Sequence, residues 1–456
     1  MGDFGLQQLR EAVAGRAAAF RTKVELQPAG GPGTKVFPPT YAGAVYAVEK
    51  RRLPDKVEPI TCVLLDSVQS QANRMEEALQ TAVDEGRIRL PVIEVDFSDR
   101  FSRDGDPTDE QPLLDPIGKV TSLQVPHRIA DAILRDSVVT EEDKQFRHKD
   151  LKKESSYGQR LRRVSAQDAT VLFELCPTAL LFGMWDSTGP KGGLGAKFER
   201  AMVSEIVGLN AVFGVKTSSR LDPLSIKAGA TIYHRNADGG LDWTSDTDDP
   251  AVVKDKKGNP VPYNRSGNSE GTPGNPSKAN HSNVTPSFGK FTKGAEGLNP
   301  LTDTDARQGQ IAPGGVTIDC AEQSIVLSLP ALRRLKFPVN GDCMPERDAA
   351  ARTVLAALGL CAAALADESG LDLRSRCLLW PTQESLSWEL LQRGKAEAVS
   401  LTADEAVELF NQSVEAAKNE GLPWRDDPLV LQPSEQLVQL VANSQRLTVD
   451  EGSEAE

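Results

Sequence analysis

Residues 60–97, ITCVLLDSVQSQANRMEEALQTAVDEGRIRLPVIEVDF, contain the strand, helix and second strand that decide the fold. The run ITCVLL is short, apolar and rich in residues that favour strands. Asp66, Ser67 and Ser70 then offer side chains that can cap a helix N-terminus. A helix follows, because apolar side chains recur at helical spacing at Val68, Ala72, Met75, Leu79 and Val83. With LPVIEVDF as the next strand, this order predicts the β-α-β start of a split ferredoxin-like unit.

The segments before residue 60 predict a helix, a strand and a loop. Apolar side chains at helical spacing over residues 6–20 predict a helix that packs on the core. The residues FRTKVELQ alternate as a strand does. PAGGPGTKVFPPT, at residues 28–40, is a loop because its glycines and prolines disrupt regular structure.

Further strands and helices are predicted beyond residue 97, and the fold class that we expect is α+β. The apolar runs VLFELC and ALLFGMW, around Cys176-Pro177-Thr178, are predicted strands. A glycine-rich stretch then opens a predicted helix on Phe198, Met202, Ile206 and Leu209, and AVFGVK is a further strand. Near the C-terminus we expect strands at VTIDC and SIVLSL, a helix over 346–366, a strand near 376–380, helices near 402–418 and 434–446, and an acidic, frayed tail.

Residues 251–300 differ in composition from the rest of the chain. Gly, Pro, Ser and Asn supply 25 of these 50 residues. So few apolar groups cannot offset the entropy lost when a chain is ordered into a packed core. We therefore expect a long flexible insertion here.

The net charge of −13 argues against a polyanion partner, because Lys and Arg are the main source of affinity for phosphates. The charge is unevenly distributed, however. Residues 331–456 hold 12 basic and 21 acidic side chains, a balance of −9, which leaves −4 for the first 330 residues. Residues 144–163 carry eight basic and two acidic side chains, a balance of +6. Such a run fits either a phosphate-binding surface or an ordinary solvated face.

The cysteines and the N-terminus indicate a cytoplasmic protein. The six cysteines form no C-x-x-C pair and several lie in apolar runs, so buried free thiols are expected. We identify no signal peptide and no uninterrupted apolar stretch near the roughly 18 residues of a membrane span. No metal site or cofactor is expected, since none of the four histidines is paired at metal-ligand spacing.

Three segments could bind an anion. GPKGGLGAKFE, at residues 189–199, precedes the predicted helix, so its backbone N–H groups could face a phosphate at the helix N-terminus. It matches neither G-x-x-x-x-G-K-[ST] nor G-x-G-x-x-G, and an ordinary tight connection explains it as well. The first turns of the helix after Asp66 and the predicted loop KTSSRLDP, at residues 216–223, carry hydroxyls, amides and cations suited to a sugar-phosphate chain. A capped solvated helix and a polar turn are the alternatives.

Four long segments together closely resemble the backbone subunit of the type I-G (formerly I-U) CRISPR Cascade complex, a RAMP protein of the Cas-seven group called Csb-one. They are LLDSVQSQANRMEEAL, GKVTSLQVPHRIADAILRDS, LLFGMWDSTGPKGGLGAKFERAMVSEI and KTSSRLDPLSI. The resemblance extends over roughly residues 35–380. It implies a modified RRM or ferredoxin-like palm with finger and thumb insertions.

The resemblance divides the chain into five parts. Residues 1–100 would form the first part of the palm, 101–165 a basic finger-like insertion and 166–220 the second part of the palm. Residues 221–310 would form a flexible thumb-like insertion, and 311–456 would complete the palm and add acidic C-terminal helices. The RNA-binding residues implied by position are Lys35, Ser67, Gln69, Ser70, Asn73, Arg74, Lys191, Gly192, Gly193, Lys197, Lys216, Ser218, Ser219 and Arg220.

The function implied is that of a guide (crRNA)-binding subunit without catalytic residues, which polymerises along the spacer RNA. Its partners would be crRNA, the target DNA strand, other copies of itself, the large and RAMP end-cap or processing subunits, and a helicase-nuclease recruited later. Ordinary RRMs stack bases on sheet aromatics, but the RNP signature is missing and only 5% of residues are aromatic, so backbone contacts are expected instead. Two other functions stay open: a metal-dependent RNA nuclease as in type III relatives, using Asp66 or Asp222, and a scaffold that touches only proteins.

Overall fold

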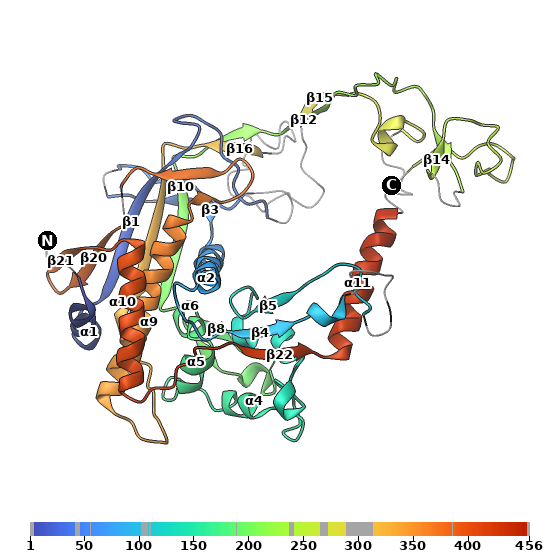
Figure 1. The fold of residues 1–456 in the computed structure, drawn as a ribbon. Helices are drawn as coiled ribbons and strands as arrows, with labels where there is room; N and C mark the ends of the chain where they lie inside the picture. The colour runs from blue at the N-terminus through green and yellow to red at the C-terminus, as the bar shows by residue number, and fades with distance from the viewer. Residues whose placement is uncertain are drawn as a thin grey trace. The chain divides into compact units, whose positions relative to one another are not determined.

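The computed structural model describes residues 4–41, 46–54, 56–101, 108, 111–187, 189–236, 241–264, 272–288, 313–384 and 386–453. Helix makes up 31% and strand 28%, which confirms the α+β class. The chain divides into two compact units, each described by itself (Figure 1). The first unit contains residues 1–41, 46–212 and 316–439, and the second contains 42–45, 213–315 and 440–456.

Among the described residues, nine strands form the main sheet of the first unit. Four of them lie in the order β19-β1-β17-β10, and every neighbouring pair is antiparallel. Helix α2 precedes β10 in the chain and α9 lies between β17 and β19, so the chain order across the sheet is 4-1-3-2, as in a ferredoxin-like or RRM sheet. The nine strands are β1 (Ala19–Pro28), β2 (Val48–Arg51), β3 (Ile60–Asp66), β10 (Met202–Leu209), β17 (Ala321–Ser328), β18 (Leu371–Asp372), β19 (Leu378–Pro381), β20 (Ser387–Gln392) and β21 (Lys395–Ser400).

The two strands and the helix predicted at residues 60–97 all form, but the two strands do not belong to the same sheet, so the predicted β-α-β start is wrong. Strand β3 lies beside β10, whereas β4 (Ile93–Asp96) joins a second sheet of order β5-β4-β22-β6-β7. The ferredoxin-like unit therefore begins at β1. Periodicity identifies an element but not its partner strand. The other strands of the second sheet are β5 (Lys119–Thr121), β6 (Ser137–Val139), β7 (Lys144–Gln145) and β22 (Leu429–Pro433).

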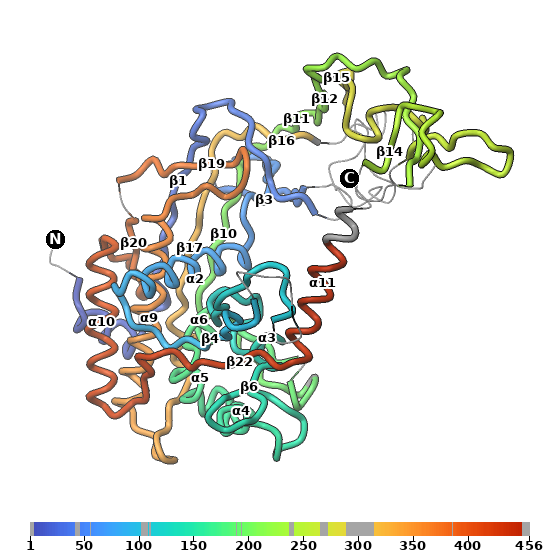
Figure 2. Tube along the Cα trace, turned by 45° about the vertical axis from the view of Figure 1, so that its right-hand side comes forward, coloured from blue at the N-terminus to red at the C-terminus, as the bar shows by residue number. Residues whose placement is uncertain are grey.

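Helix α9 (Pro345–Glu368) is the centre of the core. It is apolar on all sides and buried over most of its length, because α1, α2, α8 and α10 pack around it (Figures 1 and 2). By length and composition alone it could cross a membrane, but 83% of its most apolar window is buried inside the protein. The surrounding helices are α1 (Leu6–Ala14), α2 (Val68–Asp84), α8 (Leu329–Arg333) and α10 (Ala403–Asn419).

Three predicted elements between residues 171 and 209 are wrong. The run VLFELC forms α5 (Thr170–Leu175) and most of ALLFGMW forms α6 (Thr178–Phe182) in place of strands; Met184–Trp185, at the end of the second run, form strand β8. Both helices are buried nearly all round, so no periodicity distinguished a helix from a strand. The predicted helix after the glycines is strand β10. Met202 and Ile206 are four residues apart, a spacing that fits both a helix face and a strand face.

The C-terminal predictions are confirmed by α9, β19, α10 and α11 (Glu435–Ser453), and the last residues of the predicted tail lie outside the described residues. The predicted N-terminal helix is shorter than expected, because β1 begins at Ala19. The remaining elements of the first unit are short: α3 (Ala132–Arg135), α4 (Ser156–Leu161), β8 (Met184–Trp185), β9 (Lys197–Phe198), and single 3-10 turns at Ser98–Arg100, Arg128–Ala130, Thr140–Glu142 and Gly192–Leu194.

Part of the second unit is ordered in residues 251–300, where the composition predicted a flexible insertion. Tyr263 is fully buried, and Ile232 and Val252 are buried as well. The Tyr263 hydroxyl donates to Asp242 Oδ2 at 2.7 Å, so one aromatic ring anchors a small core. Residues 265–271 and 289–300 of the predicted insertion lie outside the described residues. The strands here are β11 (Val212–Val215), β12 (Thr217–Arg220), β13 (Tyr233–His234), β14 (Trp243–Thr244), β15 (Val284–Phe288) and β16 (Pro313–Thr317), with a 3-10 turn at Pro276–Ala279.

The cysteines are free thiols, as predicted. Cys62, Cys176, Cys361 and Cys377 are buried, and burial raises the pKa of Cys361 to about 12. The prediction of burial is wrong for Cys343, which is exposed just before α9.

Candidate nucleic-acid interface

The N-terminus of α2 is capped as the sequence predicted, by Ser67. Its Oγ accepts a hydrogen bond from the backbone N–H of Ser70 at 3.2 Å. Gln69 and Asn73 are exposed beyond this cap, whereas Ser67 and Ser70 are half-buried. The first two turns of α2 therefore present neutral amides to solvent, next to the positive end of the helix.

Asp66 has a different role from the predicted cap. Its side chain is fully buried and accepts from Gln71 Nε2 at 2.7 Å, Arg74 Nε at 3.0 Å and Arg374 Nη2 at 3.1 Å. Arg74 also donates through Nη2 to the carbonyl of Leu373 at 2.6 Å. Arg74, a predicted RNA contact, thus fastens the loop before β19 to α2, with part of its side chain exposed. No local pattern indicated Arg374, which is 308 residues from Asp66 in the chain.

The glycine-rich stretch forms the loop of a β-hairpin, not the N-terminus of a helix. Strand β8 pairs with β9, with Trp185 opposite Lys197. Two glycines let this loop close around Asp186: a Cβ at Gly189 would lie 2.0 Å from Asp186 Oδ1, and one at Gly195 would lie 1.7 Å from the Asp186 carbonyl oxygen. Close packing therefore accounts for these glycines, which corrects the helix-dipole interpretation.

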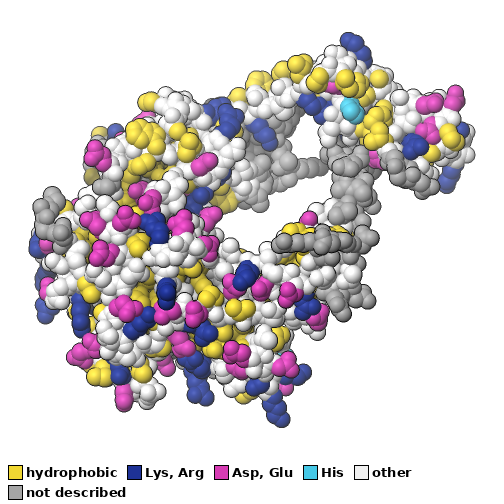
Figure 3. Space-filling view, viewed as in Figure 1, with side chains coloured by type: hydrophobic (Ala, Val, Ile, Leu, Met, Phe, Trp, Pro, Cys, Tyr) yellow, Lys and Arg dark blue, Asp and Glu magenta, His cyan; other side chains and the backbone are white. Residues whose placement is uncertain are grey.

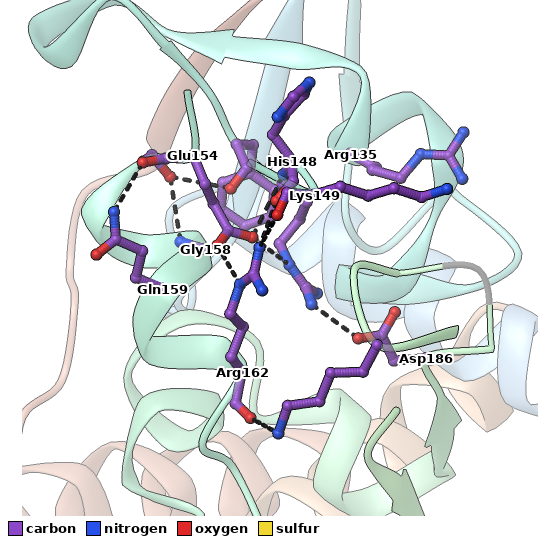
Figure 4. A network of polar contacts seen from close by, with 12 residues as sticks. Arg135, His148, Lys149, Glu154, Gly158, Gln159, Arg162 and Asp186 are labelled. Atoms are coloured by element: carbon purple, nitrogen blue, oxygen red, sulfur yellow. Dashed lines mark hydrogen bonds and ion pairs between the residues drawn. The ribbon is translucent and has the colours of Figure 1, made fainter. Parts of the chain in front are cut away.

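Asp186 connects this loop to the basic run at residues 144–163 (Figure 4). Arg147 Nη2 donates to Asp186 Oδ2 at 2.8 Å, and Arg147 Nε lies 3.6 Å from the buried Glu154. Arg162 donates to the other Glu154 oxygen, and Lys191 donates to the Arg162 carbonyl. Arg147 is itself buried. Part of the predicted +6 surface is therefore an internal network that holds the hairpin loop in place.

Trp185, Lys197 and Gln69 line one groove of about 780 Å³ between the start of α2 and the hairpin. Trp185 is 56% exposed, and the Lys197 ammonium lies 5.6 Å from the centroid of its ring. His127, Arg200 and Ser187 also line the groove. Two predicted contacts from segments about 130 residues apart are thus brought together. Trp185, His127 and Arg200 were missed, although a tryptophan at the end of an apolar run beside a glycine-rich turn was a usable signal.

A buried ion pair fixes the position of this groove. Arg128 donates to both Glu76 oxygens at 2.7 Å and through Nη1 to the Gly183 carbonyl at 3.1 Å. Burial raises the pKa of Glu76, and the Arg128 charge opposes that shift. Arg128 has φ of +51°, a conformation that non-glycine residues rarely adopt. The pair ties α2 to the residue just before β8, and so sets the hairpin against α2.

The remaining predicted contacts do not line this groove. Lys35 is half-buried in the loop after β1, where the neighbouring Val36 bridges to Val316. Lys191 is exposed, and Gly192 and Gly193 follow it in the hairpin loop. The predicted set is therefore divided among several surfaces.

Lys216, Ser218, Ser219 and Arg220 belong to the second unit. Ser218, Ser219 and Arg220 lie on a two-stranded ribbon of β12 and β15, and Lys216 directly precedes β12, which corrects the predicted loop. Lys216 and both serines are exposed, and Ser218 Oγ lies 3.2 Å from Ser287 Oγ. Arg220 donates to the carbonyls of Ser282, at 3.1 Å, and His281, at 2.6 Å, so its guanidinium holds a turn of its own unit.

Both acids considered for metal-dependent cleavage carry structural hydrogen bonds. Asp66 is fully buried with three donors, as described above. Asp222 accepts from the backbone N–H groups of Leu224, at 3.0 Å, and Ser282, at 2.7 Å, and these bonds hold the pKa of its carboxyl below the ordinary value. Within the described ranges, no three His, Cys, Asp or Glu side chains gather as a metal site would require.

The outer face of the main sheet is polar and ion-paired. Lys23 pairs with Glu322 at 2.9 Å, and Arg51 pairs with Glu205 at 2.7 Å. Acidic and basic side chains are also interspersed over the part of the first unit seen in Figure 3, where α2 and α10 lie in front of the sheet. Within the described residues, the central strands thus lack the exposed aromatic pairs of an ordinary RRM.

The fold and the groove together define an α+β protein with an RRM-like sheet, in which a groove of mixed apolar and polar lining flanks the first turns of a helix. Residues 20–212 match the family described as CRISPR-associated protein GSU0053, which supports a role in a CRISPR system. The matched segment includes β1, α2 and every lining residue of the groove. No curated protein matches the chain.

Proposed function

We propose that this chain is a guide (crRNA)-binding backbone subunit of a type I CRISPR surveillance complex, in which copies lie side by side along the RNA. The groove beside the start of α2 is the observation that carries this proposal. It brings the Gln69 amide and the Lys197 ammonium to one surface, and the family match covers both residues.

The groove suits a sugar-phosphate chain better than a particular base sequence. Gln69 and Ser187 offer neutral donors, Lys197 and Arg200 offer positive charge, and phosphate contacts carry no sequence information. Each copy has few cations at this surface, so each copy binds weakly. Many copies on one RNA would still bind strongly, because every bound neighbour raises the effective concentration of the next contact.

Further parts of the proposal concern partners and activity. The guide held by this chain would pair with the target DNA strand, and the assembly would include the large subunit and a RAMP end-cap subunit in the cytoplasm. A helicase-nuclease recruited later would cut the DNA. The chain itself would hold RNA without cleaving it or using a cofactor.

Native mass measurement of the assembly purified from cells tests the proposal. The expected result is a multimer whose mass includes one guide RNA. Lys197→Glu should reduce the RNA retained, because it places a negative charge in the groove. Lys395→Glu is the matched control, since Lys395 is exposed on β21 and pairs with Glu397 outside the groove. Protein recovered as a monomer without RNA would contradict the proposal.

A further inference from the structure

We propose that Trp185 is a stacking platform for one unpaired base and that Lys197 binds the phosphate beside that base. The inference rests on the proposed function, because the base would belong to the bound guide. It departs from the expectation that contacts would be made to the RNA backbone alone.

Trp185 has the exposure and rigidity that a stacking platform requires. More than half of this large apolar side chain is open to solvent, whereas Met184 and Phe198 of the same hairpin are buried beneath it. The next residue, Asp186, is held by its backbone bond to Ala196 at 3.0 Å and by the Arg147 guanidinium. The indole therefore projects from a fixed ribbon, and little side-chain entropy is lost when a base stacks on it.

Lys197 supplies a positive charge that can bind the phosphate of a nucleotide whose base stacks on Trp185. It lies opposite Trp185 in the ladder, and its ammonium lies within cation–π distance of the ring. Arg200 adds a second cation to the groove. Glu199 is the acid of the lining, and its charge is paired with Arg334 at 2.9 Å. Positive charge beside an aromatic face fits an anionic, planar ligand.

The groove has room for one nucleotide, and side chains in its lining can donate hydrogen bonds to the edge of the base. Its volume of about 780 Å³ lies within the range of small-ligand sites, roughly 300–1,000 Å³. The Gln69 amide and the His127 ring, both exposed, line the groove with Trp185. Every base has an aromatic face, so stacking here tolerates any guide sequence.

A nucleotide titration of the full chain labelled with 15N at its indole groups tests this inference directly. Adenosine 5′-monophosphate should shift the Trp185 resonance, identified from its absence in Trp185→Phe, in a saturable way. Ribose 5-phosphate, which lacks the base, should leave it nearly unchanged. No shift with adenosine 5′-monophosphate would overturn the inference. A shift in a chain that assembles on no RNA would leave the stacking site standing and refute the proposed function alone.

Affinity for a short single-stranded RNA provides the second test. Trp185→Ala should weaken binding by about 5- to 150-fold, the effect of losing one base–aromatic stack. Trp185→Phe should retain most of the affinity. Trp380→Ala is the matched control, because Trp380 is 52% exposed on β19, outside the groove. Equal affinity of wild type and Trp185→Ala would overturn the inference while the proposed function stands. Crosslinking of Trp185 to a protein subunit instead of RNA would also overturn it.

Discussion

Replacing Glu76 by Gln tests the ion pair that sets the hairpin against α2. The Glu76 side chain is 1% exposed and Arg128 is 8% exposed, so water cannot compensate for a lost charge. Two hydrogen bonds of 2.7 Å join them. Removing one partner of such a pair leaves the other buried without a counter-charge, which costs about 3–5 kcal/mol. That is a large share of a typical stability of about 5–15 kcal/mol.

Equilibrium urea denaturation followed by circular dichroism measures this loss. Glu199→Gln is the control: it breaks the exposed pair with Arg334, and should change the unfolding free energy by less than about 1 kcal/mol. The double variant Glu76→Leu with Arg128→Met should recover most of the stability, because no charge is then left buried. A loss below about 1 kcal/mol for Glu76→Gln would refute the reasoning, since the charge would then not be isolated from water.

Four further predictions concern Gly195, Asp367 and Asp222. Gly195→Ala should destabilise the chain by about 1–3 kcal/mol in thermal denaturation, since its Cβ would overlap the Asp186 carbonyl; an unchanged midpoint would show that the loop can shift. Asp367→Asn should raise the free energy of unfolding at neutral pH by less than about 1 kcal/mol, because burial raises the pKa of this carboxyl at the C-terminal end of α9. This gain should vanish as pH falls and the wild-type carboxyl becomes protonated, and a gain that does not depend on pH would contradict the prediction. Target RNA incubated with the assembly and magnesium should stay intact, and regular cleavage lost in Asp222→Ala would favour the nuclease alternative. Since the pKa of Asp222 is lowered, its stabilising bond to Ser282 should be present above the ordinary pKa and lost as pH falls through the folded pKa, which the same denaturation series in acid would show.

The sequence predicted the elements of the palm better than their pairing. The helix after Ser67 and its cap were predictable, because capping and helical periodicity depend on residues within four positions. The sheet order was not, because β1 pairs with β17 and β20 across some 300 and 370 residues. The apolar runs near Cys176 were ambiguous, since a buried short helix and a buried strand have the same composition.

The candidate site was predictable only in part, for a related reason. Gln69 and Lys197 were identified individually, but nothing local indicated that they would share a groove. Arg74 was predicted as an RNA contact from the family resemblance, by its position on the helix after Asp66, whereas Asp66 and Leu373 hold its guanidinium. The structural arginines of the basic run were equally hidden, since their partner Glu154 lies within the same run and its burial depends on tertiary packing.

The position of β17 shows that the segment matched by the family does not contain a complete sheet. This strand lies between β1 and β10, yet it comes more than 100 residues after the matched segment ends at residue 212. At the usual ribosomal rate of about 5–20 residues per second, β1 emerges roughly 15–60 s before β17 does. During that interval the edges of β1 and β10 that β17 will cover are open to pairing with other strands. A fragment cut at residue 212 would lack the central strand of its own sheet, so the matched segment, residues 20–212, does not contain a complete folding unit.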